Sequence, residues 1–149
     1  MRVSALAFAV AVAGLALSPA LADDVPAFLA DGQVYAVEGA CDPAEGEEYP
    51  GLKLTEQGIF GYEFGCRFVG ISGVPSLDGG DSHQHIATAS CGDDSGISRP
   101  DLILLMPSLD GESVDVTSQN DYAISMAWEK DGPSGISWMV QQVYKRCAK

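Results

Sequence analysis

The sequence predicts a small all-β domain, an antiparallel barrel or sandwich of about eight short strands held by two disulfides. Three observations lead to this prediction. Apolar and polar residues alternate over short segments, turn-forming residues separate those segments, and four cysteines follow an export-type leader. No segment shows apolar residues at helical spacing over three turns. Closing the sheet would also protect its strand edges from pairing with other chains.

The individual strands are predicted from patterns of apolar residues. Leu52 and Leu54 alternate with polar neighbours, and apolar or aromatic residues take every second position from Tyr62 to Phe68. The segment 102–106 is a continuous apolar run of strand length between two prolines. In chain order, we expect strands near residues 34–37, 52–55, 62–71, 83–91, 102–106, 112–117, 122–128 and 136–144.

Turn-forming residues separate these segments. Glycine adopts positive φ without steric cost, and Asn or Asp tolerates it. The pair Asp110-Gly111 lies between two strand-like segments and is the strongest hairpin signal in the chain. Further turns are expected at 78–81, 120–121 and 131–133. The segment 42–50 contains two prolines and four carboxylates, so we expect a solvated loop there.

The first 22 residues have the layout of a secretory signal peptide. Arg2 supplies a positive start, residues 5–17 are apolar, and the small-residue step at 20–22 predicts cleavage after Ala22. The apolar run is too short for a stable membrane span. We therefore expect residues 23–149 to form a single exported domain, periplasmic or secreted.

The export signal determines how Cys41, Cys66, Cys91 and Cys147 are interpreted. In an oxidising compartment they are expected to form two disulfides. Four cysteines allow three pairings. We favour Cys41–Cys66 and Cys91–Cys147, because the first would tie the acidic loop to the third strand and the second would tie the fourth strand to the last.

The charge balance limits the classes of partner. The chain carries a net charge of −13, and removal of a leader containing Arg2 would leave −14. Binding to nucleic acid or to an anionic membrane surface requires clustered Lys and Arg, so neither partner is expected. A cationic partner would instead be attracted to this surface at modest salt. The same charge also serves simply to keep an exported protein in solution.

A pattern that runs from Gly58 to Cys147 supports export. It is carried by residues 58–63, Cys66-Arg67-Phe68, the Cys91-Gly92 step and the terminal Tyr144-Lys145-Arg146-Cys147. In these residues the chain resembles small exported four-cysteine proteins of alphaproteobacteria. Their shared pattern is Gly-Ile-x-Gly-Tyr-Glu-x-x-Cys-x-Phe, then Cys-Gly, then Tyr-x-Arg-Cys. The resemblance implies export and disulfides, and it implies no activity. The turn near Asp78 and the connection 131–136 depart from the pattern.

A fainter likeness is to the periplasmic inhibitors of c-type lysozyme, which are small exported antiparallel barrels that insert a loop into the lysozyme cleft. The corresponding residues here, in the same order, are Ser118, Tyr122, Trp128, Lys130 and Gly132. Gln119 stands where that loop has glycine, and Asp121 stands where it has a positive charge. The resemblance makes Ser118, Tyr122 and Lys130 candidate binding residues and lysozyme a candidate partner.

Two further groups of residues are candidates for cation or metal binding. His83 and His85 would share one face of a strand, and the nearby Asp81 could supply a third ligand. Alternatively, these are ordinary polar residues beside a surface turn. The carboxylates of Glu45, Glu47 and Glu48 could bind a cation, although their spacing is not that of a calcium loop.

Taken together, these features predict an exported binding protein without enzymatic activity, whose acidic surface takes a cationic or protein partner. No catalytic residue and no cofactor are predicted. The alternatives are a periplasmic lysozyme inhibitor, a passive protein of the envelope, and a hydrolase that uses paired carboxylates. The separation that such a hydrolase requires between its carboxylates cannot be inferred from sequence spacing.

Overall fold

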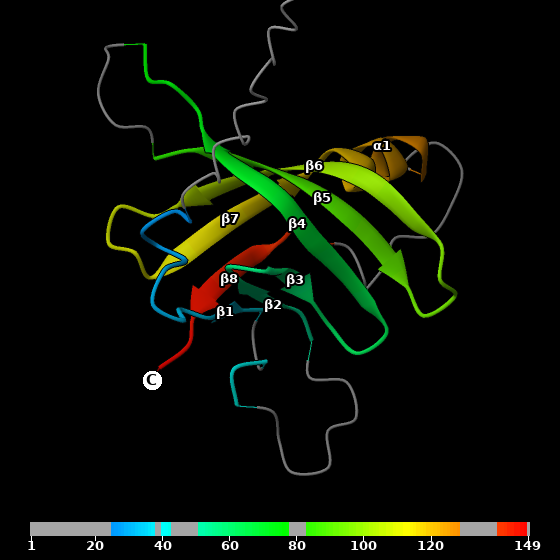
Figure 1. Cartoon of the computed structure of the whole chain (residues 1–149), viewed down its shortest axis with the longest axis horizontal. Coiled ribbons are helices and arrows are strands. Elements are labelled where there is room, and N and C mark those ends of the chain that lie inside the picture. The colour runs from blue at the N-terminus through cyan, green and yellow to red at the C-terminus, as the bar shows by residue number, and fades with distance from the viewer. Residues whose placement is uncertain (1–24, 38–39, 43–50, 78–82, 129–139, 149) are drawn as a thin grey trace, which may run out of the picture.

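The protein forms a closed antiparallel barrel, which is one of the two architectures that the sequence predicts (Figure 1). The computed structural model describes residues 25–37, 40–42, 51–77, 83–128 and 140–148. In this part of the chain the elements are β1 (Tyr35–Ala36), β2 (Lys53–Thr55), β3 (Gly58–Phe60), β4 (Phe64–Gly73), β5 (His85–Asp93), β6 (Ser98–Pro107), β7 (Ser113–Ser118), α1 (Gln119–Trp128) and β8 (Val143–Arg146). The proposed leader, residues 1–22, lies outside the described residues.

The strands follow one another around the barrel in chain order. Each strand pairs with the next, and β8 pairs back with β1 through the register Tyr35↔Arg146. The hairpin predicted at Asp110-Gly111 joins β6 to β7, and Gly111 has a φ of 72°. The Ser108 hydroxyl closes this turn by accepting a hydrogen bond from the Ser113 amide at 2.9 Å.

The core is filled by alternate residues of neighbouring strands. Ile103 and Leu105 of β6 are fully buried beside Val114 and Val116 of β7. The continuously apolar segment 102–106 nevertheless obeys the strand period of two, because Leu102 points outward and is 48% exposed. Among the described residues, no helix has the length and hydrophobicity needed to cross a membrane.

The third predicted strand is shifted by two residues, and an additional short strand precedes it. The strand expected at 62–71 begins at Phe64 and continues to Gly73, with a bulge between Phe68 and Gly70. The three residues of β3 were not expected to form a strand. They pair with both β2 and β4, and Ile59 is fully buried in the core.

The strand prediction for 122–128 is wrong, because this segment lies in α1. Ser118 is the N-cap of the helix: its hydroxyl accepts a hydrogen bond from the Asp121 amide at 3.0 Å. The order Ser118-x-x-Asp121 is that of a capping box, which is a sequence signal for a helix start. The turn expected at 120–121 is the first turn of this helix.

The favoured disulfide pairing is also wrong. The bonds join Cys41 to Cys147, with a Cα–Cα distance of 5.4 Å, and Cys66 to Cys91, with a Cα–Cα distance of 3.9 Å. Cys66 and Cys91 are direct partners in the β4–β5 register. Cys147 follows β8 and Cys41 follows β1, and these two strands are neighbours at the barrel closure. Two disulfides indicate a protein that folds outside a reducing cytoplasm.

Candidate functional site

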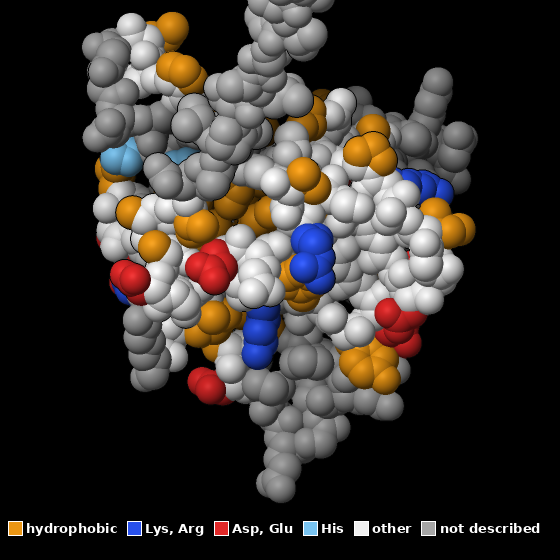
Figure 2. All heavy atoms as spheres, in the orientation of Figure 1, with side chains coloured by type: hydrophobic (Ala, Val, Ile, Leu, Met, Phe, Trp, Pro, Cys, Tyr) orange, Lys and Arg blue, Asp and Glu red, His pale blue; other side chains and the backbone are white. Residues whose placement is uncertain are grey.

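A groove of about 390 Å³ lies on the outer surface of the barrel, where β3, β4 and the end of β5 meet. Its floor is a pair of glycines, Gly65 and Gly92, which face each other in the β4–β5 register. In the space-filling view, the face over β4 and β5 shows mostly backbone and small uncharged side chains (Figure 2). Acidic and apolar side chains meet at its lower right edge.

Both floor positions require glycine because other groups approach them closely. A Cβ added at Gly65 would lie 2.7 Å from Cδ1 of Phe60, whose ring therefore rests on this position. A Cβ added at Gly92 would lie 2.5 Å from the backbone oxygen of Ile97. The Phe60 ring thus covers Gly65 and the Ile97 backbone lies against Gly92, so the floor is formed by an aromatic ring and backbone atoms.

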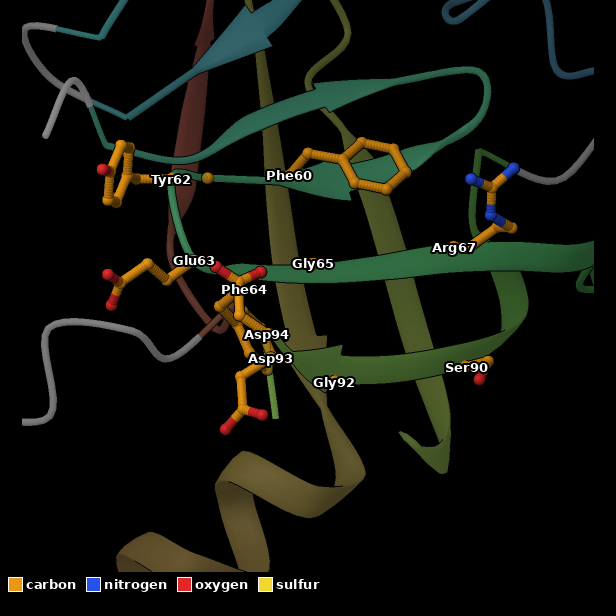
Figure 3. A pocket seen from close by; sticks show the side chains of 11 residues that line it. Phe60, Tyr62, Glu63, Phe64, Gly65, Arg67, Ser90, Gly92, Asp93 and Asp94 are labelled. Carbon is orange, nitrogen blue, oxygen red and sulfur yellow. The ribbon is translucent and has the colours of Figure 1, made fainter. Parts of the chain in front are cut away.

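The two ends of the groove carry opposite charge. Tyr62, Glu63, Asp93 and Asp94 line one end, while Arg67 lies at the other end (Figure 3). Tyr62 is 59% exposed. Among the described residues, the ion pair that forms joins Arg146 to Glu112 at 3.8 Å. The carboxylates of Glu63, Asp93 and Asp94 are not part of it.

The carboxylate of Asp93 is held in its ionised form. It accepts a hydrogen bond from the Ser95 amide at 2.9 Å, and hydrogen bonds from Ser95 keep the pKa of Asp93 below its ordinary value. The aspartate therefore serves both as a turn cap and as a fixed negative charge at the groove. An aromatic ring beside fixed carboxylates is an arrangement that can bind an ammonium or guanidinium group.

A second polar cluster, Asp101, Ser118 and Asp121, lies inside the barrel end at the start of α1. The Ser118 hydroxyl donates to Asp101 Oδ2 at 2.6 Å, and the Asn120 amide donates to Asp101 Oδ1 at 3.1 Å. The Gln141 amide donates to Asp121 Oδ2 at 2.9 Å. These bonds fix the helix start and the chain near Gln141, so the cluster has a structural role.

The same cluster contacts the inner disulfide. Cys91 Sγ lies 3.8 Å from Asp101 Oδ2, and the sulfur carries no proton because it is bonded to Cys66. Among the described residues, one group has three possible ligand atoms that are close enough to one another to hold a metal ion; it consists of Cys66, Cys91 and Asp101. The disulfide occupies both sulfurs, so this group offers no thiolate for a metal ion.

Asp121 should make stability depend on pH. Burial raises the pKa of Asp121, against the lowering effect of hydrogen bonds from Gln141 and Val140. A raised carboxyl pKa means that the folded state binds this proton more tightly, so stability is lost as pH rises through the folded pKa. Urea unfolding should show that the stability of Asp121→Asn relative to wild type increases as pH rises above about 4, the ordinary pKa of an aspartate.

The exposed Asp115 of β7 provides the matched control for this experiment. Asp115→Asn removes the same charge from a residue outside the buried cluster. A difference between wild type and Asp121→Asn that stays constant with pH would contradict the expected linkage.

The structure separates the residues that the sequence singled out. Ser118 is fully buried as the helix cap, whereas Tyr122 is 55% exposed on α1. His83 is exposed, and His85 is partly buried with its ring centroid 5.2 Å from that of Phe28. The predicted residues Lys130, Asp81, Glu45, Glu47 and Glu48 lie outside the described residues.

His85 packs against Phe28, with a ring centroid distance of 5.2 Å. Burial lowers the pKa of its imidazole, and the nearby His83 lowers it further. Its Nδ1 atom is buried and has no hydrogen-bond partner among the described residues. The two histidines form no group of three metal ligands with the other described side chains.

Sequence analysis missed Arg67, Asp93 and Asp94 as residues of one site. A usable signal was present, because charged residues flank glycines in both 61–67 and 92–94. Only the strand register brings these segments together. In comparisons with known proteins, no family model, curated protein or solved structure matches this chain.

Proposed function

We propose that the protein is an exported binding domain whose groove takes a positively charged group of a protein partner. The observation that carries this proposal is the gathering of Glu63, Asp93 and Asp94 beside the exposed ring of Tyr62. Carboxylates and an aromatic face together bind a cation through charge and through the ring quadrupole.

The net charge supports the same class of partner. With a net charge of −13, the chain attracts basic proteins, and added salt shortens the distance over which this attraction acts. A c-type lysozyme is a basic protein of this kind and is the partner suggested by the fainter sequence likeness. The contact proposed here is the groove, because Ser118 is buried beneath α1. Export through the leader at 1–22 would place the domain in the periplasm or outside the cell.

A hydrolase with paired carboxylates is a weaker proposal for the same groove. Such an enzyme needs one carboxylic acid whose raised pKa keeps it protonated. The hydrogen bonds to Asp93 shift its pKa in the opposite direction. Persistent negative charge fits cation binding better than proton donation.

Charge-removing substitutions in the groove test the binding proposal. Titration with tetralysine and with a c-type lysozyme should show that Glu63→Gln/Asp94→Asn weakens binding by about fivefold at low salt. High salt should weaken binding to the wild type and reduce the difference between the two proteins. Asp93 is kept unchanged because it caps its own turn.

The control must remove charge without touching the groove. Asp115→Asn/Glu112→Gln removes two exposed carboxylates from the β6–β7 side of the barrel. If this control lost as much affinity as the groove variant, binding would follow overall charge, and the groove proposal would be wrong. A wild type that binds neither probe would support the passive envelope protein instead.

A further inference from the structure

The basic end of the groove is formed by two strands. Arg67 of β4 and Ser90 of β5 are direct partners in the register, and both line the groove. In the close-up view both lie at the end opposite Tyr62 and Glu63, Arg67 above β4 and Ser90 on β5, with Phe60 between the two ends (Figure 3). A guanidinium group and a hydroxyl can both donate hydrogen bonds to a carboxylate.

The distance between the ends limits the size of the ligand. Phe64 and Arg67 are three positions apart within β4, which corresponds to about 10 Å between their backbone positions, and Glu63 directly precedes Phe64. An extended peptide of three residues spans about 10 Å, and a basic side chain adds several ångströms. A short peptide can therefore contact both ends, whereas the backbone of one free amino acid cannot.

The surface between the ends suits an extended backbone. Gly65 is covered by the Phe60 ring and Gly92 by the backbone of Ile97, so the surface between the two ends is an uncharged one of ring and backbone atoms. A peptide main chain can lie across this surface with its two charged groups at the two ends. The groove is thus complementary to a ligand whose positive and negative charges are separated along its length.

We propose that the groove binds the C-terminal segment of a basic peptide or protein in one orientation. The free carboxylate contacts Arg67 and Ser90, and a lysine or arginine side chain about two residues upstream contacts Glu63 and Asp94. The acidic half of this inference rests on the proposed function. The carboxylate half is new and depends on Arg67.

Two matched peptides test the orientation. N-acetyl-Lys-Gly-Gly with a free carboxylate and the same peptide with a C-terminal amide differ only in the group proposed to contact Arg67. NMR titration should show that the wild type binds the free acid about threefold or more tightly than the amide. Arg67→Gln should abolish this preference, and Arg67→Lys should retain part of it.

The other variants separate this inference from the proposed function. Glu63→Gln/Asp94→Asn should weaken both peptides by the same factor and leave the preference for the free acid intact. Arg99→Gln, which removes an arginine that does not line the groove, should leave the preference unchanged. Amide NMR spectra of each variant should show that the barrel is folded.

Three results would overturn the inference. Equal binding of the two peptides to the wild type would show that no group recognises the carboxylate. Tighter binding of both peptides to Arg67→Gln would show that Arg67 only repels cations. Failure of both peptides to bind would exclude a short C-terminal segment as the ligand. Loss of tetralysine binding in Glu63→Gln/Asp94→Asn would still support the proposed function in each of these cases.

Discussion

Gly58→Ala is expected to destabilise the barrel by about 4 kcal/mol or more, which is enough to leave a domain of this size largely unfolded. Gly58 has a φ of 145°, a conformation that residues with a side chain rarely adopt. An alanine Cβ would also overlap the backbone oxygen of Cys66 on the paired strand β4. Backbone groups in a barrel cannot move aside without breaking the ladder, so neither problem can be relieved locally.

Two other glycines separate the causes of this effect. Gly96 has a φ of 79° with nothing within 4 Å of an added Cβ, so Gly96→Ala should cost about 1–2 kcal/mol from backbone strain alone. Gly73 has open space and no positive φ, so Gly73→Ala should stay within about 0.5 kcal/mol of wild type. Urea unfolding of the three variants measures the free energy of unfolding that each one loses. Equal losses for Gly58→Ala and Gly96→Ala would show that the overlap with Cys66 is relieved.

Removing either disulfide should produce the second large loss of stability. The Cys41–Cys147 bond spans 106 residues, and its removal in Cys41→Ser/Cys147→Ser should cost about 4–5 kcal/mol through the entropy of the unfolded chain. The Cys66–Cys91 bond spans 25 residues, for which the same model gives about 3–4 kcal/mol. Cys66→Ser/Cys91→Ser also places two hydroxyl groups in the core, which adds to that cost.

Digestion with trypsin without reduction checks the pairing before any variant is made. Cleavage after Lys53, Arg67, Lys130 and Arg146 places the four cysteines on four different peptides. The structure requires peptide 54–67 to be linked to peptide 68–130, and the C-terminal peptide 147–149 to be linked to the peptide that contains Cys41. A link between peptides 54–67 and 147–149 would contradict the strand register. Thermal unfolding with and without reductant then measures the stabilisation.

The fold was predictable because most strands carry a local pattern. The continuous apolar run at 102–106, the alternation at 112–117 and the Asp110-Gly111 turn predicted the β6–β7 hairpin, and the structure confirms it. The helix was missed because its apolar residues do not repeat at helical spacing over three turns, and its clearest signal is the cap at Ser118. The β3 strand was missed because it has three residues, begins at Gly58 and is followed by Gly61.

The site and the disulfides were harder to predict for a common reason. Both depend on register, which positions residues far apart in the sequence opposite each other. Phe64↔Asp93 in the β4–β5 pairing brings the acidic turn after β5 to the segment that carries Glu63. The same pairing places Cys66 opposite Cys91. A one-residue change in this register would turn every one of these side chains to the other face of the sheet.

The closure between β8 and β1 has a consequence for how the domain opens. The strand β1 has two residues, whereas β4 and β6 have ten each, so few hydrogen bonds hold this seam. Amide hydrogen exchange through partial opening should therefore be fastest at the seam and slowest in the long hairpins. The Cys41–Cys147 bond lies beside the seam and keeps its two sides together during such an opening. This tether favours rapid reclosure over escape to extended, protease-sensitive states.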